Sequence, residues 1–293
     1  MARDLANKVV VITGGAEGIG YEIADRYLQK GAKITILLDI NEKNGADAVK
    51  KLNSKHGNNK AIYFKCDVTS DLASVSKKIL ENYKVDILVN NAGILNESLI
   101  KKTIDINVTA VIEFGFAFWE HMRKDKGGDG GTIINLASIY GYRVDQFLPI
   151  YQASKFAVMG FTKSLGHQAN FVRCGVRVVA ICPGFTETKL TDKPPIRDMG
   201  QNEEFDKFLN TQAWQKVEAV GNAAVEIFQR AESGTAWLIE GAKPIVEVCY
   251  NLIYLCVMLA TRGDYGPPPP IRGRPLFNSG LLPADDDDDV IYL

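Results

Sequence analysis

"KVVVITGGAEGIG", residues 8–20, joins a short apolar run directly to a glycine-rich loop. The run over 8–13 is almost continuously apolar and rich in β-branched residues, which is typical of a strand buried on both faces of a parallel sheet. In the loop, Gly14, Gly18 and Gly20 allow a tight turn and a close approach of the backbone to a ligand. The helix expected behind them adds unpaired N–H groups and a positive dipole end. The stretch therefore predicts a pyrophosphate site; a purely structural turn is the alternative.

The same alternation of buried strands and amphipathic helices continues along the chain. Further strands are predicted over 32–39, 61–68 and 85–93, within 126–138, and over 175–184 and 234–241. Helices are predicted over 21–31, 42–57, 71–83, 99–123, 150–172 and 218–230. Repeated β–α units of this kind predict an α/β fold: a single-domain, Rossmann-like, doubly wound parallel sheet with helices on both faces. We expect this domain to span residues 1–246.

Residues 247–293 form a C-terminal tail of different composition. An apolar segment over 247–260 is too short to span a bilayer, and runs of proline (267–270) and aspartate (285–289) follow it. Such runs cannot bury enough apolar surface to become ordered, so we expect a disordered end. A partner-binding or interfacial segment is the alternative. Within the tail, the apolar stretch 249–260 predicts a helix that packs on its own domain, on a second subunit or on a membrane surface.

The composition argues against several classes of function. The 293 residues carry a net charge of −1, which gives no electrostatic basis for binding nucleic acid or an anionic membrane. Five cysteines without a C-x-x-C pair, and only three histidines, offer no recognisable metal site. The cysteine pattern favours a reducing, cytoplasmic location. The N-terminus leads straight into a strand, so we expect neither a signal peptide nor a transmembrane segment.

An acidic residue at the end of the second predicted strand bears on the choice of cofactor. A carboxylate at Asp39 can accept hydrogen bonds from both hydroxyls of an adenosine ribose, and it would repel a 2′-phosphate. Glu17, Ile40 and Asn41 stand where a cation would be needed to hold that phosphate. The pattern therefore favours NAD over NADP, with a capping or surface role for Asp39 as the alternative.

Several further motifs occur in one order along the chain: "CDV" (66–68), "NNAG" (90–93), Asn107 within "INVT", Ser138, "YQASK" (151–155) and "PGFTET" (183–188). With the glycine loop, they resemble the motifs of the single-domain short-chain dehydrogenases/reductases, over roughly residues 5–246. The stretches "SGTAWLIEG" and "KGGDGGTIIN" are most similar to those of NAD-dependent 15-hydroxyprostaglandin dehydrogenases and insect-type alcohol dehydrogenases.

The resemblance implies a catalytic set of Asn107, Ser138, Tyr151 and Lys155. Tyr151 and Lys155 are four residues apart, so on a helix they project from one face. Tyr151 would be the general base; Lys155 and the positive nicotinamide ring would jointly lower its pKa, and Lys155 would also hold the nicotinamide ribose. Ser138 would hydrogen-bond the substrate oxygen, and Asn107 would hold a water that links Lys155 to solvent. The alternatives are a serine that merely ends a strand and a helix asparagine satisfied locally.

The resemblance also implies a set of cofactor-binding residues. Asp67 would accept a hydrogen bond from the adenine amine, Val68 would pack beside the base, and Asn91 would lie near the adenosine ribose. The stretch 183–188 would receive the nicotinamide end. The full predicted set is Gly14, Gly18, Ile19, Gly20, Asp39, Ile40, Asp67, Val68, Asn91, Tyr151, Lys155, Pro183, Gly184, Thr186 and Thr188.

These features together predict an NAD-dependent dehydrogenase that oxidises an apolar, secondary alcohol. The predicted substrate contacts are Ser138, Gln146, Leu148 and Phe185, supported by Ile139, Tyr140 and Phe147 and covered by a mobile lid over 189–215. Prostaglandin dehydrogenases have Gln immediately before the proline at the catalytic helix, where this chain has Leu148, which argues against prostaglandin itself. Related enzymes pair through helices equivalent to 99–123 and 150–172, which implies a homodimer. An NADH-dependent carbonyl reductase and a non-catalytic NAD-binding protein are the alternatives.

Overall fold

The structure is a computed structural model that describes residues 2–192 and 194–248. By its contacts, the chain up to residue 248 forms a first compact unit. The expectations for the apolar, proline and aspartate segments of the tail therefore lie almost entirely outside the described residues. No helix in the described part of the chain is long and apolar enough to cross a membrane.

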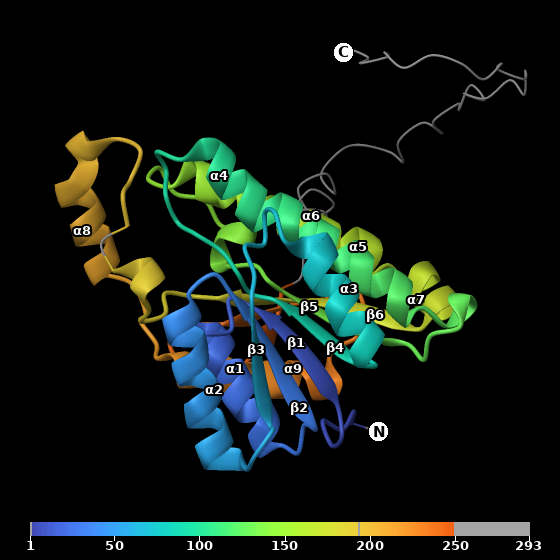
Figure 1. Ribbon diagram of the computed structural model, residues 1–293. Helices are drawn as coiled ribbons and strands as arrows, with labels where there is room; N and C mark the ends of the chain where they lie inside the picture. Colours follow the sequence, from blue (N-terminus) through green and yellow to red (C-terminus); the bar gives the residue numbers. More distant parts are fainter. Residues whose placement is uncertain (1, 193, 249–293) are drawn as a thin grey trace, which may run out of the picture. The chain divides into compact units, whose positions relative to one another are not determined.

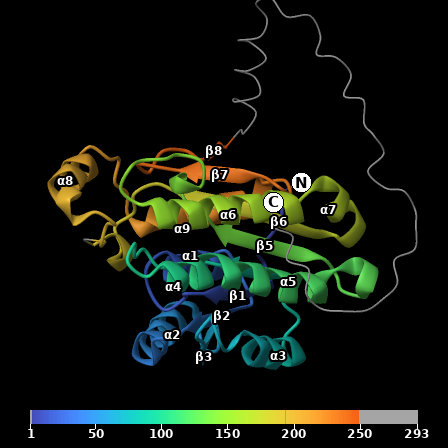
Figure 2. The ribbon, with the colours of Figure 1, turned by 90° about the horizontal axis from the view of Figure 1, so that it is seen from above.

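An eight-stranded sheet forms the centre of the first unit, and only its last strand runs antiparallel to its neighbour. Figure 2 shows the strands running from β3 at one edge to β8 at the other. Their spatial order is β3 (Ala61–Lys65), β2 (Ile34–Asp39), β1 (Val9–Thr13), β4 (Ile87–Asn90), β5 (Gly131–Leu136), β6 (Val176–Pro183), β7 (Ala236–Ile239) and β8 (Val246–Glu247). The order reverses between β1 and β4, as in a doubly wound sheet, so the predicted fold class is confirmed.

Helices cover both faces of the sheet, as Figure 1 shows. One face is covered by α1 (Gly18–Gln29), α2 (Glu42–His56) and α9 (Val217–Arg230). The other is covered by α3 (Leu72–Asn82), α5 (Ala110–Met122) and α6 (Pro149–Leu165). The central strands are buried on both sides; all five residues of β1, for example, are buried. That burial accounts for the unbroken apolar run that predicted this strand.

Two predicted helices differ from the observed ones. The stretch 99–123 consists of α4 (Ile100–Ile104), a π-helical turn (Asp105–Thr109) and α5. The stretch 150–172 is divided into α6 and α7 (Gln168–Cys174) at Gly166, where a Cβ atom would lie 2.6 Å from the carbonyl oxygen of Val178. Two further elements were not predicted: the short strand β8, and α8 (Asn202–Asn210), which lies in the segment 189–215.

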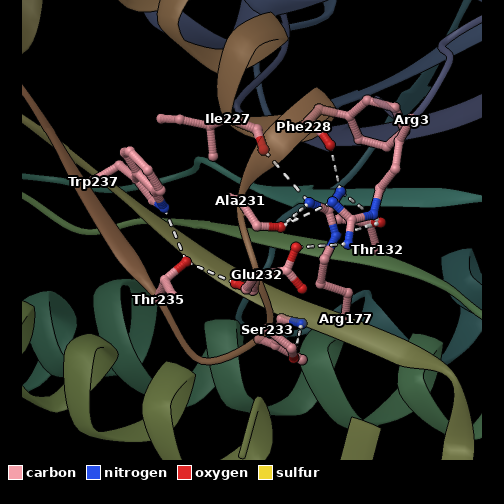
Figure 3. Close-up of polar contacts among 11 residues, drawn as sticks. Arg3, Thr132, Arg177, Ile227, Phe228, Ala231, Glu232, Ser233, Thr235 and Trp237 are labelled. Atoms are coloured by element: carbon pink, nitrogen blue, oxygen red, sulfur yellow. Dashed lines mark hydrogen bonds and ion pairs between the residues drawn. The ribbon is translucent and has the colours of Figure 1, made fainter. Parts of the chain in front are cut away.

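A buried arginine joins the sheet to the end of α9. Arg177 on β6 is 1% exposed, and its guanidinium donates to the carbonyl oxygens of Ala231 at 2.7 Å and Phe228 at 2.8 Å. It also donates to the hydroxyl of Thr132 on β5 at 3.1 Å. Figure 3 shows these contacts converging where α9 ends. The cation therefore satisfies carbonyl groups that the helix itself leaves unpaired.

Candidate active site

A cavity of about 1170 Å³ opens at the carboxyl ends of the parallel strands. Sheets of this topology bind their ligands at this edge, because the loops that follow the strands diverge there. Most of the predicted site residues line the cavity: Gly14, Gly18, Ile19, Asp39, Ile40, Asp67, Val68, Asn91, Ser138, Leu148, Tyr151, Lys155, Pro183, Gly184, Phe185, Thr186 and Thr188. Gly20, Asn107 and Gln146 are not among the lining residues.

The glycine loop has the backbone geometry that its sequence suggested. Gly14 and Gly18 have φ angles of +62° and +58°, a region that favours glycine. A Cβ atom on Gly20 would lie 2.2 Å from the carbonyl oxygen of Gly14 and 2.6 Å from the side-chain nitrogen of Asn91. Helix α1 begins at Gly18, beside the cavity. The loop and the helix N-terminus therefore fit a pyrophosphate group.

Asn91 holds this loop against the end of β4. Its side-chain amide donates to the carbonyl oxygens of Thr13 at 3.1 Å and Gly14 at 2.9 Å. The hydroxyl of Thr13 in turn accepts from the backbone N–H groups of Asn91 and Ala92. The amide of Asn91 is thus used to shape the loop, and its predicted contact with a ribose stays a prediction.

Carboxylates dominate the end of the cavity where the second strand finishes. One oxygen of Asp39 accepts from the backbone N–H of Ala16 at 3.1 Å, and the other accepts from Asn41 at 3.0 Å. Glu17, in the glycine loop, forms an ion pair with Lys189 across the cavity. Ile40 is 62% exposed, so no buried contact limits the residue at that position.

The third strand leads into a second acidic corner of the cavity. Asp67 accepts hydrogen bonds from the backbone N–H of Thr69 at 2.9 Å and from its hydroxyl at 2.7 Å. These bonds lower the pKa of Asp67, so the side chain is an anionic acceptor near neutral pH. The adjacent Val68 is buried and provides an apolar wall. Both properties fit the predicted adenine contacts.

Ser138, Tyr151 and Lys155 meet at the centre of the cavity, and each is less than 8% exposed. Ser138 follows β5, whereas the other two lie on one face of α6. The amine of Lys155 donates to the carbonyl oxygen of Leu136 at 2.8 Å and lies 5.5 Å from the centre of the Tyr151 ring. The sheet edge and the helix thus bring a hydroxyl, a phenol and an amine together.

Asn107 lies in the π-helical turn and is completely buried. Its side chain accepts from the N–H of Ile94 and donates to the carbonyl oxygen of the same residue, both at 2.8 Å. It also donates to the hydroxyl of Ser154 at 3.1 Å. A Cβ atom on Gly93 would lie 3.3 Å from the Asn107 oxygen and 3.8 Å from the Lys155 nitrogen. These partners lie in the loop after β4 and on α6, outside the helical segment of Asn107. The water that Asn107 was predicted to hold stays a prediction.

The titration behaviour of the central pair is set by burial. Burial raises the pKa of Tyr151 to about 12, and a hydrogen bond with Ser138 opposes that rise. Burial lowers the pKa of Lys155 to about 8, because the charged amine loses its hydration. The chain alone therefore holds a neutral phenol beside an amine that is protonated below about pH 8. Lys155 is not among the groups that shift the pKa of Tyr151.

The other end of the cavity is walled by aliphatic and aromatic side chains. Tyr140 packs edge-on against Tyr151, with ring centres 6.2 Å apart, and against Phe185 at 6.0 Å. From the segment predicted as a lid, Trp214 packs on Phe185 at 5.3 Å and α8 contributes Phe205, which is 3% exposed. The segment therefore contributes Phe205 and Trp214 to the aromatic wall, and its predicted mobility stays a prediction.

Two predicted residues of this region do not reach the cavity lining. The side-chain amide of Gln146 donates to Glu204 on α8 at 3.3 Å, at the protein surface. Phe147 lies behind the lining and packs on Phe205, with ring centres 5.1 Å apart. Leu148, at the start of α6, lines the cavity as predicted.

Residues that sequence reasoning missed also contribute to the site. Thr13 holds the end of β4, Ser154 links Asn107 to the catalytic helix, and Glu97 is a completely buried acid beside that helix. Ser154 stands inside the "YQASK" motif, which was a usable signal. Glu97 lies three residues beyond Ile94 in a loop, where nothing in the sequence distinguishes it from a surface acid.

Comparisons with known proteins agree with this geometry. The chain is 39% identical over 202 residues to the 15-hydroxyprostaglandin dehydrogenase (NAD(+)) of Macaca fascicularis, which covers 68% of this chain and 76% of the relative. It is 34% identical over 241 residues to alcohol dehydrogenase 1 of Ceratitis cosyra, covering 80% and 92%. The crystal structure of a 3-ketoacyl-(acyl-carrier-protein) reductase from Brucella melitensis complexed with NADH superposes with a TM-score of 0.69 at 25% identity, covering 81% and 98%.

Sequence, fold and site thus lead to the same family. The glycine loop, the loop after β4 and the Ser–Tyr–Lys group all meet at one edge of a doubly wound sheet. A family model described as short chain dehydrogenase matches residues 8–196, which include each of these parts. The chain is an oxidoreductase that belongs to the short-chain dehydrogenase family.

Proposed function

We propose that this protein oxidises an apolar, secondary alcohol to a carbonyl with NAD, and that Tyr151 is the general base. The observation that carries the proposal is the buried group of Ser138, Tyr151 and Lys155, set between a dinucleotide-shaped cleft and an apolar wall. The relatives named as NAD-dependent prostaglandin and alcohol dehydrogenases support it. The catalytic domain would span 1–246, and the cysteine pattern supports a cytoplasmic location.

Three side chains of the protein would act at or near the alcohol oxygen, each in a different role. The Ser138 hydroxyl would hydrogen-bond this oxygen and stabilise its developing negative charge. As a phenolate, Tyr151 would accept the hydroxyl proton and become a neutral phenol, and Lys155 as a cation would stabilise the phenolate before this transfer. When NAD is bound, it supplies the hydride acceptor and a positive ring near the phenol. Leu148 and Phe185 would hold the hydrocarbon part of the substrate and exclude water.

A screen of alcohols with the full-length protein tests the proposal. Secondary alcohols with apolar chains, matched primary alcohols and carboxylate-bearing analogues would be compared by following the absorbance of NADH. We expect the uncharged secondary alcohols to give the highest kcat/KM, because the pocket wall is aliphatic and aromatic. NAD binding without turnover of any alcohol would instead support a non-catalytic NAD-binding protein. Turnover confined to ketones and NADH would support a carbonyl reductase.

Asp39 is expected to set the preference for NAD. In the double variant Asp39→Ala, Ile40→Arg, a repulsive carboxylate is removed and an exposed guanidinium is added, which can pair with a 2′-phosphate. Asp39 also binds the N–H of Ala16, so absolute activity should fall and the readout is the ratio of kcat/KM values. We expect this ratio to shift toward NADP by at least about tenfold, or 1.4 kcal/mol.

Asp47→Ala is the control for this change, because Asp47 is an exposed acid on α2 that does not line the cavity. It should leave the cofactor ratio unchanged. A wild-type protein that already uses NADP as well as NAD would contradict the role of Asp39.

We also propose that the protein is a homodimer joined through α5 and α6. Phe116 on α5 is 47% exposed and Phe156 on α6 is 40% exposed. Ala153, Ala157 and Gly160 are exposed on α6 at helical spacing. This apolar stripe would pack on its own symmetry copy across a two-fold axis.

The dimer predicts that Ala157→Arg, which introduces two buried like charges at the two-fold contact, converts the protein to a monomer. Sedimentation velocity would measure the change. Ala169→Arg, at an exposed position on α7, is the matched control and should leave the size unchanged. The interface is elsewhere if Ala157→Arg sediments like the wild type.

A further inference from the structure

Glu97 contacts the first turn of the helix that carries Tyr151. It lies in the loop after β4 and is 0% exposed. One of its carboxylate oxygens accepts from the backbone N–H of Ile150 at 2.9 Å. The other accepts from the backbone N–H of Tyr151 itself at 2.8 Å. Both oxygens of a buried acid are therefore used on two successive N–H groups of α6.

Helix α6 has no cap of its own. Leu148, the residue before the helix, forms no side-chain capping bond, and Pro149 at the first position has no N–H group. Glu97 supplies the missing acceptors from a distant part of the chain. A carboxylate suits this place because it complements the positive end of the helix dipole and forms charge-assisted hydrogen bonds. No ion pair of Glu97 with a basic side chain is found among the described residues.

The backbone of Tyr151 is thus held from two sides. Its N–H group donates to Glu97, and its carbonyl oxygen accepts from the Ser154 hydroxyl at 2.7 Å. Ser154 is fixed in turn by Asn107, whose side chain also binds Ile94 in the same loop as Glu97. The loop that lines the cavity through residues 93–95 therefore binds the Tyr151 N–H group directly, through Glu97, and is linked to the Tyr151 carbonyl oxygen through Asn107 and Ser154.

We propose that Glu97 is a positioning residue for the reaction, which fixes the Tyr151 phenol relative to Ser138 and the substrate. The proposal rests on the function proposed above. Ser138 follows a strand and Tyr151 belongs to a helix, so their spacing depends on how the helix start is anchored. A misplacement of about 1 Å can lower a rate by roughly a hundredfold. A carboxylate bound to the Tyr151 N–H limits that displacement directly.

Glu97→Gln tests this role with the smallest change of shape. The amide keeps one acceptor oxygen, but it turns an NH₂ group toward one of the two N–H donors. We expect kcat to fall by about ten- to a hundredfold. KM and Kd for NAD should stay within about twofold, because the glycine loop is untouched. Glu97→Asp keeps the charge on a shorter stem and should lose less activity, which covers the case that the amide variant fails to fold.

Asp86→Asn is the matched control for a simple loss of stability. Asp86 also accepts from a backbone N–H, that of Val9 at 2.8 Å, and it pairs with Lys8, but it precedes β4 at the amino ends of the strands, opposite the cavity. The Asp86→Asn variant should have a lower melting temperature than the wild type. Its kcat, measured well below that temperature, should stay within about twofold of the wild type. Hydrogen exchange of the cofactor-free protein adds a readout without activity. Peptides that cover 150–155 should exchange faster in Glu97→Gln and not in Asp86→Asn.

Each outcome decides the proposal. A folded Glu97→Gln variant with kcat within about twofold of the wild type overturns it, even if exchange at the helix start increases, because Glu97 would then be a structural cap only. Equal losses of kcat in the Glu97 and Asp86 variants overturn it as well. A wild-type protein that turns over no alcohol is a different failure, visible in the same assay, and it removes the proposed function together with the role of Glu97.

Discussion

Replacing Tyr151 by phenylalanine is expected to lower kcat by at least about a hundredfold, the usual scale for the loss of a general base. The substitution removes only the hydroxyl group. The ring remains edge-on to Tyr140, with ring centres 6.2 Å apart in the wild type, so the packing of the cavity is kept. The glycine loop and Asp39 are unaffected. Calorimetric titration should therefore give a Kd for NAD close to that of the wild type.

Tyr142→Phe is the control for this change. Tyr142 has a largely buried hydroxyl group near the same cluster, but it does not line the cavity. Loss of its hydroxyl should leave kcat within about twofold, since no proton-transfer role is assigned to it. Retention of most of the activity by Tyr151→Phe would remove Tyr151 as the base and would require a different group to accept the proton.

Under the proposed function, the environment of Tyr151 gives a bound NAD a role in preparing the base. Without a bound ligand, the pKa of the phenol is about 12 and that of the Lys155 amine is about 8. Raising the pH favours the phenolate but removes the charge on Lys155 above about pH 8, so the two titrations oppose each other. A positive nicotinamide ring would favour the phenolate without this conflict, because its charge does not titrate.

The sheet could be predicted from the sequence because its strands are buried on both faces. The runs over 8–13 and 175–184 correspond to β1 and β6, whose residues are all buried. A strand that is buried on both faces needs apolar residues at successive positions, so it can be recognised from a short stretch of sequence. The edge strand β8 is different. It has two exposed residues and is defined by its pairing with β7, so no buried face marks it as a strand in the sequence.

The candidate site shows the same division between local and long-range signals. The glycine loop and the Tyr151–Lys155 pair are local spacings, and the structure places both in the cavity. The π-helical turn at Asn107 depends on one extra residue in a helical turn, which no periodicity in the apolar residues reveals. The position of Gln146 depends on where α8 packs, and its contact with Glu204 crosses 58 residues of sequence.

Arg177→Met is the stability change with the largest expected effect. Within the described residues, no carboxylate accepts a hydrogen bond from the guanidinium. Burial lowers the pKa of Arg177 to about 10, so it keeps its charge near neutral pH. Methionine relieves the burial of that charge, but it leaves the carbonyl oxygens of Phe228 and Ala231 without this donor at a buried helix end. The Ala231 oxygen keeps its bond from Arg3, whereas the Phe228 oxygen and the Thr132 hydroxyl lose this donor. The second effect should dominate, because each unsatisfied buried group costs about 1–3 kcal/mol. We expect a loss of about 3 kcal/mol in the free energy of unfolding.

For a unit of this size, about 3 kcal/mol corresponds to a fall of roughly 6–12 °C in Tm, measurable by calorimetry. Arg3→Met is the control for this change. Arg3 donates to the same Ala231 oxygen at 3.1 Å, but its side chain is 32% exposed, so water can replace it. Its loss should be below about 1 kcal/mol. Figure 3 shows the guanidinium groups of Arg3 and Arg177 meeting at Ala231. The two variants therefore compare the loss of a buried donor with the loss of a partly exposed donor to the same carbonyl oxygen. Equal shifts in Tm for both variants would mean that the burial of Arg177 does not decide the stability of this helix end.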